Sequence, residues 1–457
     1  MAPPFWTLDR VAAALRRFAP VALPRGTRPL AGVSTDTRTV REGELFVALS
    51  GENFNAHDFL EQAVAKGAAA VVVSHPERAA TLGVPAYVVS DTLAALGALG
   101  AYRRAAWGKS VIAVAGSNGK TTTKELIRAA LSSRLDVHAT TGNLNNLVGV
   151  PLTLLALRDE ADVAVIEMGT NVPGEVGRLR ALAAPDLSVV TSVGEEHLEG
   201  LGSLEQILRE ECSAYDGVEV AVAPADQPEV AREARSRAKQ VVTAGLDDGD
   251  VRATRWSIGA DALGEIDMDG VVVRPPVRGE HNLRNTMLAL AVARACGVEL
   301  ADAARGIAVM PQPSMRLAWQ SLGRATMIND AYNANPASMR AALDLLSRSD
   351  QTRQRVAILG TMRELGPHAP RLHDEIARYA LAAPIDIVAG VGEMGDALRA
   401  AAGQTNGDTR VVIAPDVEEL WVALAPRLDR EAVILLKASR GVKLERLVPF
   451  LTDWAGA

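Results

Sequence analysis

The sequence predicts an α/β fold in which mostly parallel sheets are covered by helices. Short apolar runs alternate with amphipathic helical segments along most of the chain, which is typical of repeated β-α units. The length of 457 residues is too great for one hydrophobic core and favours about three domains. We expect a small α/β domain at residues 1–105, a central domain with a parallel sheet at 106–312, and a Rossmann-like α/β domain at 313–457.

A strand, a glycine loop and the start of a helix follow one another at residues 111–125. Val111–Ala115 has the small and apolar side chains of a strand buried on both faces. The glycines allow a close backbone approach to a ligand, and the amides of the helix start would point at one spot. Lysine adds a positive charge, and threonine a hydroxyl suited to phosphate-bound magnesium. We therefore predict a nucleotide-phosphate loop formed by Gly116, Ser117, Asn118, Gly119, Lys120, Thr121 and Thr122.

The spacing of this loop differs from the common pattern, which has four residues between the glycines where this chain has two. The alternative is a glycine turn followed by a surface lysine. The preceding strand, the following helix and the Lys-Thr pair favour the phosphate loop, so the central domain is expected to be P-loop ATPase-like.

Composition and charge exclude several classes of protein. The net charge of −7 leaves no basic footprint for nucleic acid. Two cysteines, Cys212 and Cys296, support neither a disulfide framework nor a zinc cluster, as expected in a reducing cytosol. No signal-peptide pattern is evident, and the most apolar long run, residues 147–157, is too short to span a membrane. We expect a cytoplasmic protein without a membrane span.

The first hundred residues contain a polar cluster in a small α/β unit. Its elements are expected at 43–49 (strand), 56–66 (helix), 70–73 and 87–89 (strands) and 92–105 (helix). Hydroxyls and a guanidinium where a loop meets a strand could hold phosphates or a uracil ring. An Asx-type turn with a solvated arginine is the alternative. The cluster consists of Ser34, Asp36, Thr37 and Arg38.

The central domain carries polar residues after two of its expected strands. Glu167 ends a strand at 162–169 and has the position expected of a magnesium ligand. The strand at 187–193 is followed by Glu195, Glu196 and His197, of which the carboxylates suit magnesium better by chemistry alone. An asparagine-rich segment suits a binding loop or plain turns and contains Thr141, Asn143, Asn145 and Asn146.

Later elements supply further candidates. We expect strands at 218–224 and 240–245, an antiparallel ribbon at 252–278 and a helix at about 280–296, where Asn282 and Asn285 share a face and could meet a base or cap the helix. In the last domain we expect strands at 325–330, 355–360, 385–391, 410–413 and 432–437, and helices at 336–348, 372–380, 417–424 and 443–451. Polar segments at 330–336, 360–366 and 437–441 follow strands, where such sheets bind ligands.

Five motifs together resemble the Mur ligase family of peptidoglycan synthesis, over nearly the whole chain. They are Gly-Ser-Asn-Gly-Lys-Thr-Thr-Thr-Lys-Glu (116–125), Gly-Asn-Leu-Asn-Asn (142–146), His-Leu-Glu-Gly (197–200), His-Asn-x-x-Asn (281–285) and Asp-Ala-Tyr-Asn-Ala-Asn-Pro (330–336). Within the family, they are most similar to members that add D-alanyl-D-alanine to a UDP-N-acetylmuramoyl-tripeptide. The Asp-Asn-Pro-Arg motif of diaminopimelate-adding members is absent.

The resemblance implies an ATP- and magnesium-dependent ligase, monomeric, that forms an acyl phosphate and then an amide. It implies that the first domain holds the UDP-sugar-peptide, the second ATP and the third the incoming dipeptide. Lys120, Glu167 and His197 would be catalytic, with Thr121, Glu167 and His197 as metal ligands. Asn282, Asn285, Arg316 and Asp330 would contact the nucleotide. Substrate would contact the polar cluster, the asparagine-rich loop, and Tyr332, Asn333 and Asn335.

Two positions depart from the family. A lysine that is normally carbamylated, and whose carboxylate helps to hold a second magnesium, aligns with Glu211 when counted without gaps from His197. We expect Glu211 to supply that carboxylate directly, with Glu210 as second choice. Thr361 stands where the family often has aspartate, which leaves the dipeptide contacts open.

The sequence leaves three alternatives open. The chain could be another Mur-type ligase that adds diaminopimelate or lysine, or an enzyme similar to folylpolyglutamate synthetase, although that enzyme lacks a UDP-binding unit. It could also be a non-catalytic nucleotide-binding homologue, against which the retention of Lys120, Thr121, Glu167 and His197 argues.

Overall fold

The computed structural model describes residues 4–51, 54–403 and 410–456, and it confirms the α/β prediction. The chain divides into two compact units. The first unit consists of Met1–Ala113, Asp136–Gly169 and Glu175–Asp186, and the second of Val114–Leu135, Thr170–Gly174 and Leu187–Ala457. The predicted domain borders at residues 105 and 312 stay predictions.

The N-terminal part is built on a four-stranded parallel sheet. Its order is β3-β4-β7-β8, with β3 at Val33–Ser34, β4 at Leu45–Val47, β7 at Ala70–Val73 and β8 at Ala86–Val88. The helices are α1 (Leu8–Leu15), α2 (Leu60–Ala65), α3 (Pro76–Ala79) and α4 (Thr92–Trp107). A 3-10 turn, η1 (Ala56–Phe59), precedes α2, and the short pairs are β1 (Trp6–Thr7) with β2 (Pro29–Leu30) and β5 (Ser50–Gly51) with β6 (Phe54–Asn55).

Sequence signals explain the length of α4. Asp91 begins the helix, because its carboxylate accepts hydrogen bonds from the amides of Leu93 and Ala94. Gly108 ends it in the left-handed conformation, with φ of 69°. The helix therefore continues two residues past the predicted end at 105, as far as Trp107.

A seven-stranded sheet has the order β10-β11-β9-β12-β13-β14-β15. The strands are β9 (Ser110–Ala115), β10 (Val137–Ala139), β11 (Val163–Glu167), β12 (Leu187–Val190), β13 (Val220–Pro224), β14 (Gln240–Gly245) and β15 (Val251–Arg252). The pair β10-β11 is parallel, and so are the successive pairs from β12 to β15. Its helices are α5 (Lys120–Leu131), α6 (Gly149–Leu155), α7 (Glu175–Ala183), α8 (Leu198–Leu201), α9 (Leu204–Cys212), with the 3-10 turn η2 (Ser213–Tyr215), and α10 (Pro228–Arg237).

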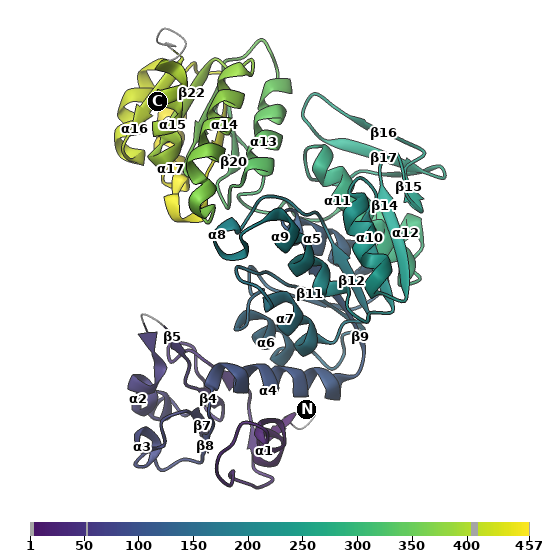
Figure 1. Cartoon of the computed structure of the whole chain (residues 1–457), viewed down its shortest axis with the longest axis vertical. Helices are drawn as coiled ribbons and strands as arrows, with labels where there is room; N and C mark the ends of the chain where they lie inside the picture. The colour runs from purple at the N-terminus through teal and green to yellow at the C-terminus, as the bar shows by residue number, and fades with distance from the viewer. Residues whose placement is uncertain (1–3, 52–53, 404–409, 457) are drawn as a thin grey trace. The chain divides into compact units, whose positions relative to one another are not determined.

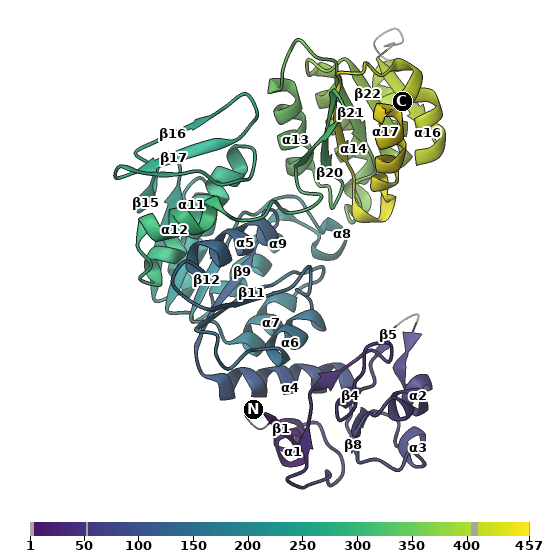
Figure 2. The ribbon, with the colours of Figure 1, turned by 180° about the vertical axis from the view of Figure 1, so that it is seen from behind.

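The predicted antiparallel ribbon is present as three strands, β16 (Arg255–Ile258), β17 (Gly264–Met268) and β18 (Val271–Val273). It lies beside α11 (Glu280–Ala295) and α12 (Leu300–Ala308), as both views show (Figures 1 and 2). Helix α11 begins next to Gly279, whose φ is 88°, and eleven of its sixteen residues are buried. Helix α11 packs on α5 within the second unit.

The C-terminal sheet has six strands in the order β19-β20-β24-β21-β22-β23. Only β19 is antiparallel to its neighbour among the described strand pairs of this sheet. The strands are β19 (Ala318–Leu322), β20 (Ala325–Asp330), β21 (Arg355–Leu359), β22 (Ile387–Val391), β23 (Val411–Ala414) and β24 (Val433–Lys437). The helices are α13 (Pro336–Arg348), α14 (Ala369–Ala382), α15 (Gly392–Gly403), α16 (Val417–Leu424) and α17 (Leu447–Gly456), with 3-10 turns η3 (Gly366–His368), η4 (Ala425–Arg427), η5 (Arg440–Val442) and η6 (Leu444–Arg446).

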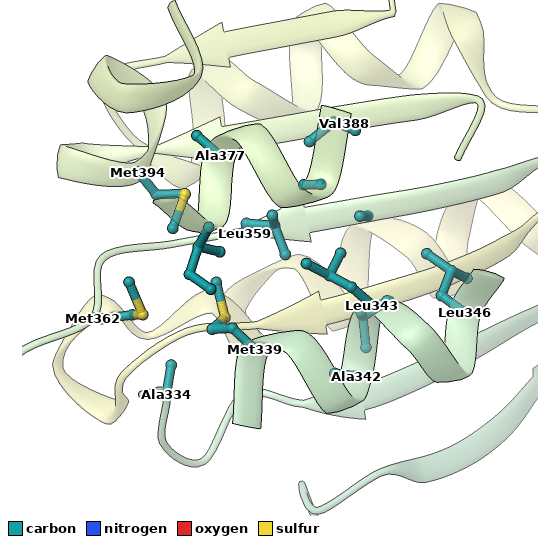
Figure 3. Packing of buried hydrophobic residues seen from close by; sticks show 14 of the residues in the cluster. Ala334, Met339, Ala342, Leu343, Leu346, Leu359, Met362, Ala377, Val388 and Met394 are labelled. Carbon is teal, nitrogen blue, oxygen red and sulfur yellow. The ribbon is translucent and has the colours of Figure 1, made fainter. Parts of the chain in front are cut away.

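Two apolar layers cover this sheet. Helices α13, α14 and α15 pack on one face, and α16 and α17 on the other (Figure 1). Met339, Leu343 and Leu346 of α13 recur at helical spacing and meet Leu359 of β21 and Met362 just beyond it (Figure 3). This core fixes the carboxyl ends of β20, β21 and β24, which carry the polar segments named above.

Some predicted elements differ from the observed ones. The segment predicted as a helix at 443–451 begins with η6, and α17 starts only at Leu447. Lys443 precedes it in the left-handed conformation, with φ of 58°, which a continuous helix cannot contain. Helix α15 and strand β10 were not predicted. In the described part of the chain, every helix is too short or too polar to cross a membrane.

Candidate functional site

The loop between β9 and α5 needs glycine at both predicted positions. Gly116 has a φ of 119°, and a Cβ there would lie 2.4 Å from Oγ1 of Thr191 and 2.7 Å from its backbone nitrogen. Gly119 has a φ of 85° and begins α5, and a Cβ there would lie 2.7 Å from Nδ2 of Asn285. Conformation and space both exclude larger side chains here, so the loop can form only with these glycines.

The backbone of the loop is held by the segment that follows β12. The amide of Ser117 donates to the carbonyl oxygen of Ser192 at 2.7 Å, and the amide of Asn118 donates to Oγ of Ser192 at 3.2 Å. The hydroxyl of Thr191 donates to the carbonyl oxygen of Asn118 at 2.6 Å. These bonds fix the loop in one conformation at the start of α5, where the helix dipole favours an anion.

The ammonium group of Lys120 is folded back over the loop. Its Nζ donates to the carbonyl oxygens of Gly116 and Ser117, the latter at 3.1 Å, and lies 3.3 Å from a carboxylate oxygen of Glu196. Both charged side chains are largely buried. Lys120 therefore places a positive charge directly over the turn that is predicted to hold phosphates.

Glu211 reaches the same loop from the last turn of α9. Its Oε2 accepts a hydrogen bond from the amide of Gly116 at 2.7 Å. Its Oε1 is buried and has no hydrogen-bond partner among the described residues. Burial raises the pKa of this carboxyl group to about 7; Lys120 works in the opposite direction and the charge of Glu196 adds to the rise. A buried carboxylate oxygen without a partner, beside a phosphate loop, suits a cation.

Glu210, the second choice for the metal-binding carboxylate, bonds to the segment 170–174 instead of the phosphate loop. Its Oε2 accepts from the amide of Gly174 at 2.7 Å, and its Oε1 lies 3.4 Å from the hydroxyl of Thr170. Of the two neighbouring glutamates, the structure brings Glu211 to the phosphate loop.

His197 lies beside Glu196, at the start of α8. The backbone of His197 is left-handed, with φ of 51°, and its Nε2 is 3.7 Å from Oε1 of Glu196. Its Nδ1 is 2.5 Å from a carboxylate oxygen of Glu364. Burial works to lower the pKa of His197, but the contact with Glu364 and the charge of Glu196 outweigh it and the pKa is raised. The described residues contain no group of three or more His, Cys, Asp or Glu side chains arranged to hold a metal ion.

Residues beyond position 312 also reach the loop. Arg316 donates to Oγ1 of Thr121 at 3.0 Å, and its guanidinium lies 4.1 Å from the ring centroid of Tyr332. Asn335 donates from Nδ2 to Oδ1 of Asn118 at 2.7 Å. The phosphate loop is thus contacted by two side chains that lie about 200 positions away in the sequence.

Asp330 and Asn333 hold the backbone near Arg316 and Asn335 through hydrogen bonds. Asp330 pairs with Lys437 at 2.6 Å, at the matching ends of β20 and β24, and accepts from the amide of Leu317 at 3.0 Å. Lys437 also donates to the carbonyl oxygen of Asn333. Asp330 therefore fixes the backbone next to Arg316.

The predicted base-side asparagines form a chain of hydrogen bonds. Asn285 donates to Oδ1 of Asn282 at 3.0 Å, and Asn282 donates to the carbonyl oxygen of Arg278 at 2.7 Å. Both are buried, and Asn285 lies against Gly119. They connect the start of α11 to the phosphate loop.

In the first unit, Glu167 meets the asparagine-rich loop. Its Oε1 accepts from Nδ2 of Asn145 at 2.9 Å. Oδ1 of Asn146 accepts from the amides of Val148 and Gly149, which forms a turn just before α6 and is the turn-forming role. Asn143 is exposed, and the carbonyl oxygen of Thr141 accepts from Leu144.

The N-terminal polar cluster is tied together internally. Asp36 accepts from the amide of Arg38 at 2.8 Å and pairs with its guanidinium at 2.6 Å. These hydrogen bonds lower the pKa of Asp36 to about 2. Ser34 bonds to the backbone of Asp36, and the carbonyl oxygen of Thr37 accepts from Lys66. The geometry of the alternative, an Asx-type turn with an exposed arginine, is present, and a binding role stays a prediction.

Some residues at the site were not predicted individually. Glu364 lies within the polar segment 360–366, so its position after a strand was the available signal. Ser192 carried no signal, because nothing in the sequence identifies which hydroxyl holds a loop more than 70 positions away. Thr361, the departure from the family, accepts from the amide of Glu393 at the start of α15.

Comparisons with known proteins agree along the chain. Three family models match in succession: "Mur ligase family, catalytic domain" at residues 29–104, "Mur ligase middle domain" at 114–293, and "Mur ligase, glutamate ligase domain" at 315–440. The UDP-N-acetylmuramoyl-tripeptide–D-alanyl-D-alanine ligase of Bacillus subtilis (strain 168) is 35% identical over 433 residues, covering 92% of this chain and 93% of the relative.

Solved structures are similar over almost the full length. MurF from Acinetobacter baumannii has a TM-score of 0.88 and 32% identity, covering 98% of this chain and 99% of that one. MurF from Thermotoga maritima, solved in complex with ADP, has a TM-score of 0.81 and 25% identity, covering 93% and 98%.

Proposed function

The chain belongs to the Mur ligase family, and from this premise we propose that it joins D-alanyl-D-alanine to a UDP-N-acetylmuramoyl-tripeptide in peptidoglycan precursor synthesis. It is an ATP-dependent, ADP-forming peptide ligase. The observation that carries the proposal is the contact of Arg316 with Thr121 and of Asn335 with Asn118. A nucleotide at this loop would be held by the central domain and the last domain together, as a ligase with an acyl phosphate intermediate requires.

The chemistry needs positioning and charge neutralisation rather than covalent help. A carboxylate oxygen of the tripeptide attacks the γ-phosphorus of ATP, and the bond to ADP breaks. The amine of the dipeptide then attacks the acyl carbon, loses a proton, and phosphate leaves. Lys120 can exchange its carbonyl partners for phosphate oxygens, which bind an ammonium group more strongly.

One feature of the structure supports the magnesium that the family implies. Oε1 of Glu211 is a buried carboxylate oxygen without a hydrogen-bond partner in the described structure, next to the loop that presents Thr121. Thr121, His197 and Glu211 are the proposed ligands in the second unit, and Glu167 is a proposed ligand in the first. When bound, magnesium neutralises charge on the transferring phosphate.

The remaining assignments are part of the same proposal. Asn282, Asn285, Arg316 and Asp330 serve the nucleotide. Ser34, Asp36, Thr37, Arg38, Thr141, Asn143, Asn145 and Asn146 serve the UDP-linked substrate, and Tyr332, Asn333 and Asn335 serve the dipeptide side. The protein works as a cytoplasmic monomer of three domains, 1–105, 106–312 and 313–457, in cell-wall synthesis and thus in cell shape and division.

The test measures ADP release from ATP with the UDP-tripeptide, with and without D-alanyl-D-alanine, and the mass of the UDP-linked product. We expect the dipeptide to stimulate release and to appear in the product. Lys120→Met should abolish release, whereas Lys239→Met, at an exposed ion pair with Glu219, should not. Stimulation by diaminopimelate or lysine instead would assign another Mur-type reaction. No release with any of these amines would favour a non-catalytic homologue.

A further inference from the structure

Arg363 is an exposed arginine in the polar segment 360–366, to which the proposed mechanism gives no task. In the described part of the chain, no carboxylate lies within ion-pair distance of its guanidinium, whose hydrogen bond to the carbonyl oxygen of Gly441 is long, at 3.4 Å. Its positive charge acts on the neighbouring Glu364, where it lowers the pKa less than the contact with His197 does. Most of the five N–H donors of the guanidinium therefore remain for a ligand.

Gly441 makes room for this guanidinium. A Cβ at position 441 would lie 2.5 Å from Cζ of Arg363 and 2.9 Å from Nε, and still closer to a terminal nitrogen. These three atoms are the nearest ones, and Gly441 does not have a positive φ, so the backbone conformation does not require glycine here. The missing side chain at 441 therefore serves Arg363, whose guanidinium lies directly on the bare backbone.

The backbone of Arg363 is held at the carboxyl ends of three strands. Its amide donates to Oγ of the buried Ser439, beyond β24, at 2.9 Å. The hydroxyl of Ser439 donates in turn to the carbonyl oxygen of Ala334, beyond β20, at 3.3 Å. The preceding residue, Met362, is buried in the apolar core beyond β21 (Figure 3). The guanidinium therefore extends from a rigid support formed by β20, β21 and β24.

The same support is linked to the phosphate loop within the second unit. Asn335 donates to Oδ1 of Asn118 at 2.7 Å. On the other side, Glu364 lies 2.5 Å from Nδ1 of His197, at the start of α8. An extended dipeptide spans at most about 7 Å. A dipeptide whose amine reaches an acyl phosphate at this loop must therefore find a partner for its carboxylate close by, and Arg363 is one residue away from the contact with His197.

A guanidinium in this setting suits the carboxylate of a peptide. Its planar fork can donate two parallel hydrogen bonds to the two carboxylate oxygens, and opposite charge strengthens both. The triphosphate is the less suitable partner, because the carboxylate of Glu364 is next in the chain and repels a polyanion. A dipeptide zwitterion carries one group of each sign and complements such a pair of side chains.

We propose that Arg363 is a specificity-determining residue that binds the terminal carboxylate of the incoming dipeptide, and that Gly441 keeps its guanidinium in place. The identity of the dipeptide rests on the proposed function, whereas the preference for a free carboxylate is a property of Arg363. The proposal gives the segment 360–366 a task in binding the amine substrate, which the departure from the family at Thr361 leaves open.

The first measurement compares D-alanyl-D-alanine with D-alanyl-D-alaninamide, which has the same amine but no carboxylate charge. The KM of each is determined from ADP release in the presence of the UDP-tripeptide. We expect the wild type to have a KM about 10- to 100-fold higher for the amide, as hydrogen bonds to a charged group imply. In Arg363→Met the two KM values should be about equal. Arg363→Lys should keep part of the preference, because the ammonium group retains the charge but not the fork.

Gly441→Ala tests the position of the guanidinium while Arg363 itself is kept. The new methyl group displaces only the end of a flexible side chain, so the protein should fold with the wild-type Tm, and the preference for the free carboxylate should fall. Arg399→Met is the matched control, since Arg399 is an exposed arginine on α15 that pairs with Asp396 at 2.7 Å. The control should keep the wild-type preference, and the KM for ATP should be unchanged in every variant.

The second measurement determines the same preference without turnover. Calorimetric titration with each of the two dipeptides, in the presence of ADP and magnesium, gives their Kd values. We expect the wild type and Arg399→Met to bind the free dipeptide about 10- to 100-fold more tightly than the amide. Arg363→Met should bind both with similar affinity.

A wild-type protein that takes the amide as readily as the free dipeptide would overturn the proposal. So would a preference that persists in folded Arg363→Met. A KM for ATP that rises as much as the KM for the dipeptide would assign the guanidinium to the nucleotide phosphates instead. A wild type without dipeptide-stimulated ADP release would contradict the ligase function, and the Kd values would still decide whether Arg363 binds a carboxylate. Failure to bind either dipeptide would overturn both.

Discussion

At the scale of single residues, Glu211 has the least usual environment at the site. One of its carboxylate oxygens bonds to the amide of Gly116, and the other is buried without a partner in the described structure. Leaving a buried polar atom unpaired normally costs about 1 to 3 kcal/mol, so a protein without use for it would be more stable with another side chain. A cation at the phosphate loop would remove that cost.

We therefore expect Glu211→Gln to fold and to lose most of its response to magnesium. Glutamine keeps the bond to the amide of Gly116 but lacks the negative charge, so the magnesium concentration for half-maximal ADP release should rise about 10- to 100-fold. Glu210→Gln is the matched control, because Glu210 bonds Gly174 instead. Thermal unfolding without metal should show Glu211→Gln to be no less stable than the wild type.

A second variant separates charge from geometry. Glu211→Lys introduces the residue that the family normally carbamylates, and its activity should depend on added bicarbonate, whereas the wild type should be indifferent to it. Full activity of Glu211→Ala with an unchanged magnesium requirement would contradict a metal-binding role for this position.

At the scale of elements, helix α13 serves both stability and the site. Its first residue is preceded by Asn335, whose side chain accepts from the amide of Ser338 at 2.9 Å and donates to Asn118 at 2.7 Å. Ser338 completes a capping box by accepting from the amide of Asn335. One side chain thus fixes the start of the helix and connects it to the phosphate loop.

These two tasks of Asn335 can be separated by substitution. Asn335→Ser keeps a good helix cap but cannot reach Asn118, so we expect stability within a few tenths of a kcal/mol of the wild type and weaker ADP binding. Asn335→Ala loses both, with a cost of about 1 kcal/mol in unfolding free energy. Urea unfolding and calorimetric titration with ADP measure the two effects. Equal ADP affinity in all three proteins would mean that the contact with Asn118 does not serve the nucleotide.

The elements also show which parts of the fold local sequence determines. The strands β7, β14 and β20 and the helices α13 and α16 have the predicted bounds, because turn-forming or capping residues delimit each apolar run. Strand β10 was missed because its Val137–Ala139 run is short, polar in the middle and only half buried. The start of α17 was misplaced because Lys443 adopts a left-handed conformation that no local pattern predicts.

At the scale of the whole molecule, the site depends on contacts that sequence spacing cannot reveal. The glycine loop was predictable because strand, glycines and lysine are contiguous. The choice of Glu211 over Glu210 followed from a gap-free count, and the structure places Glu211 on Gly116. The contacts of Arg316 and Glu364 join positions far apart in the chain, so only the fold brings them together.

Because the second unit joins the loop to residues beyond 312, nucleotide binding should be felt on both sides of these contacts. We expect ADP with magnesium to slow amide hydrogen exchange in residues 116–123 and also in 316–318 and 329–338, while β16 to β18 remain unchanged. The reason is that a ligand bound only to the folded site stabilises the contacts that complete it, by about 2.7 kcal/mol at 100 times its Kd.

In Arg316→Ala, the protection of 316–318 and 329–338 should be lost first, because the link through Thr121 and Tyr332 is removed. Protection confined to residues 116–123 in the wild type would show that the last domain does not share in holding the nucleotide, and would also remove the main support for the ligase mechanism.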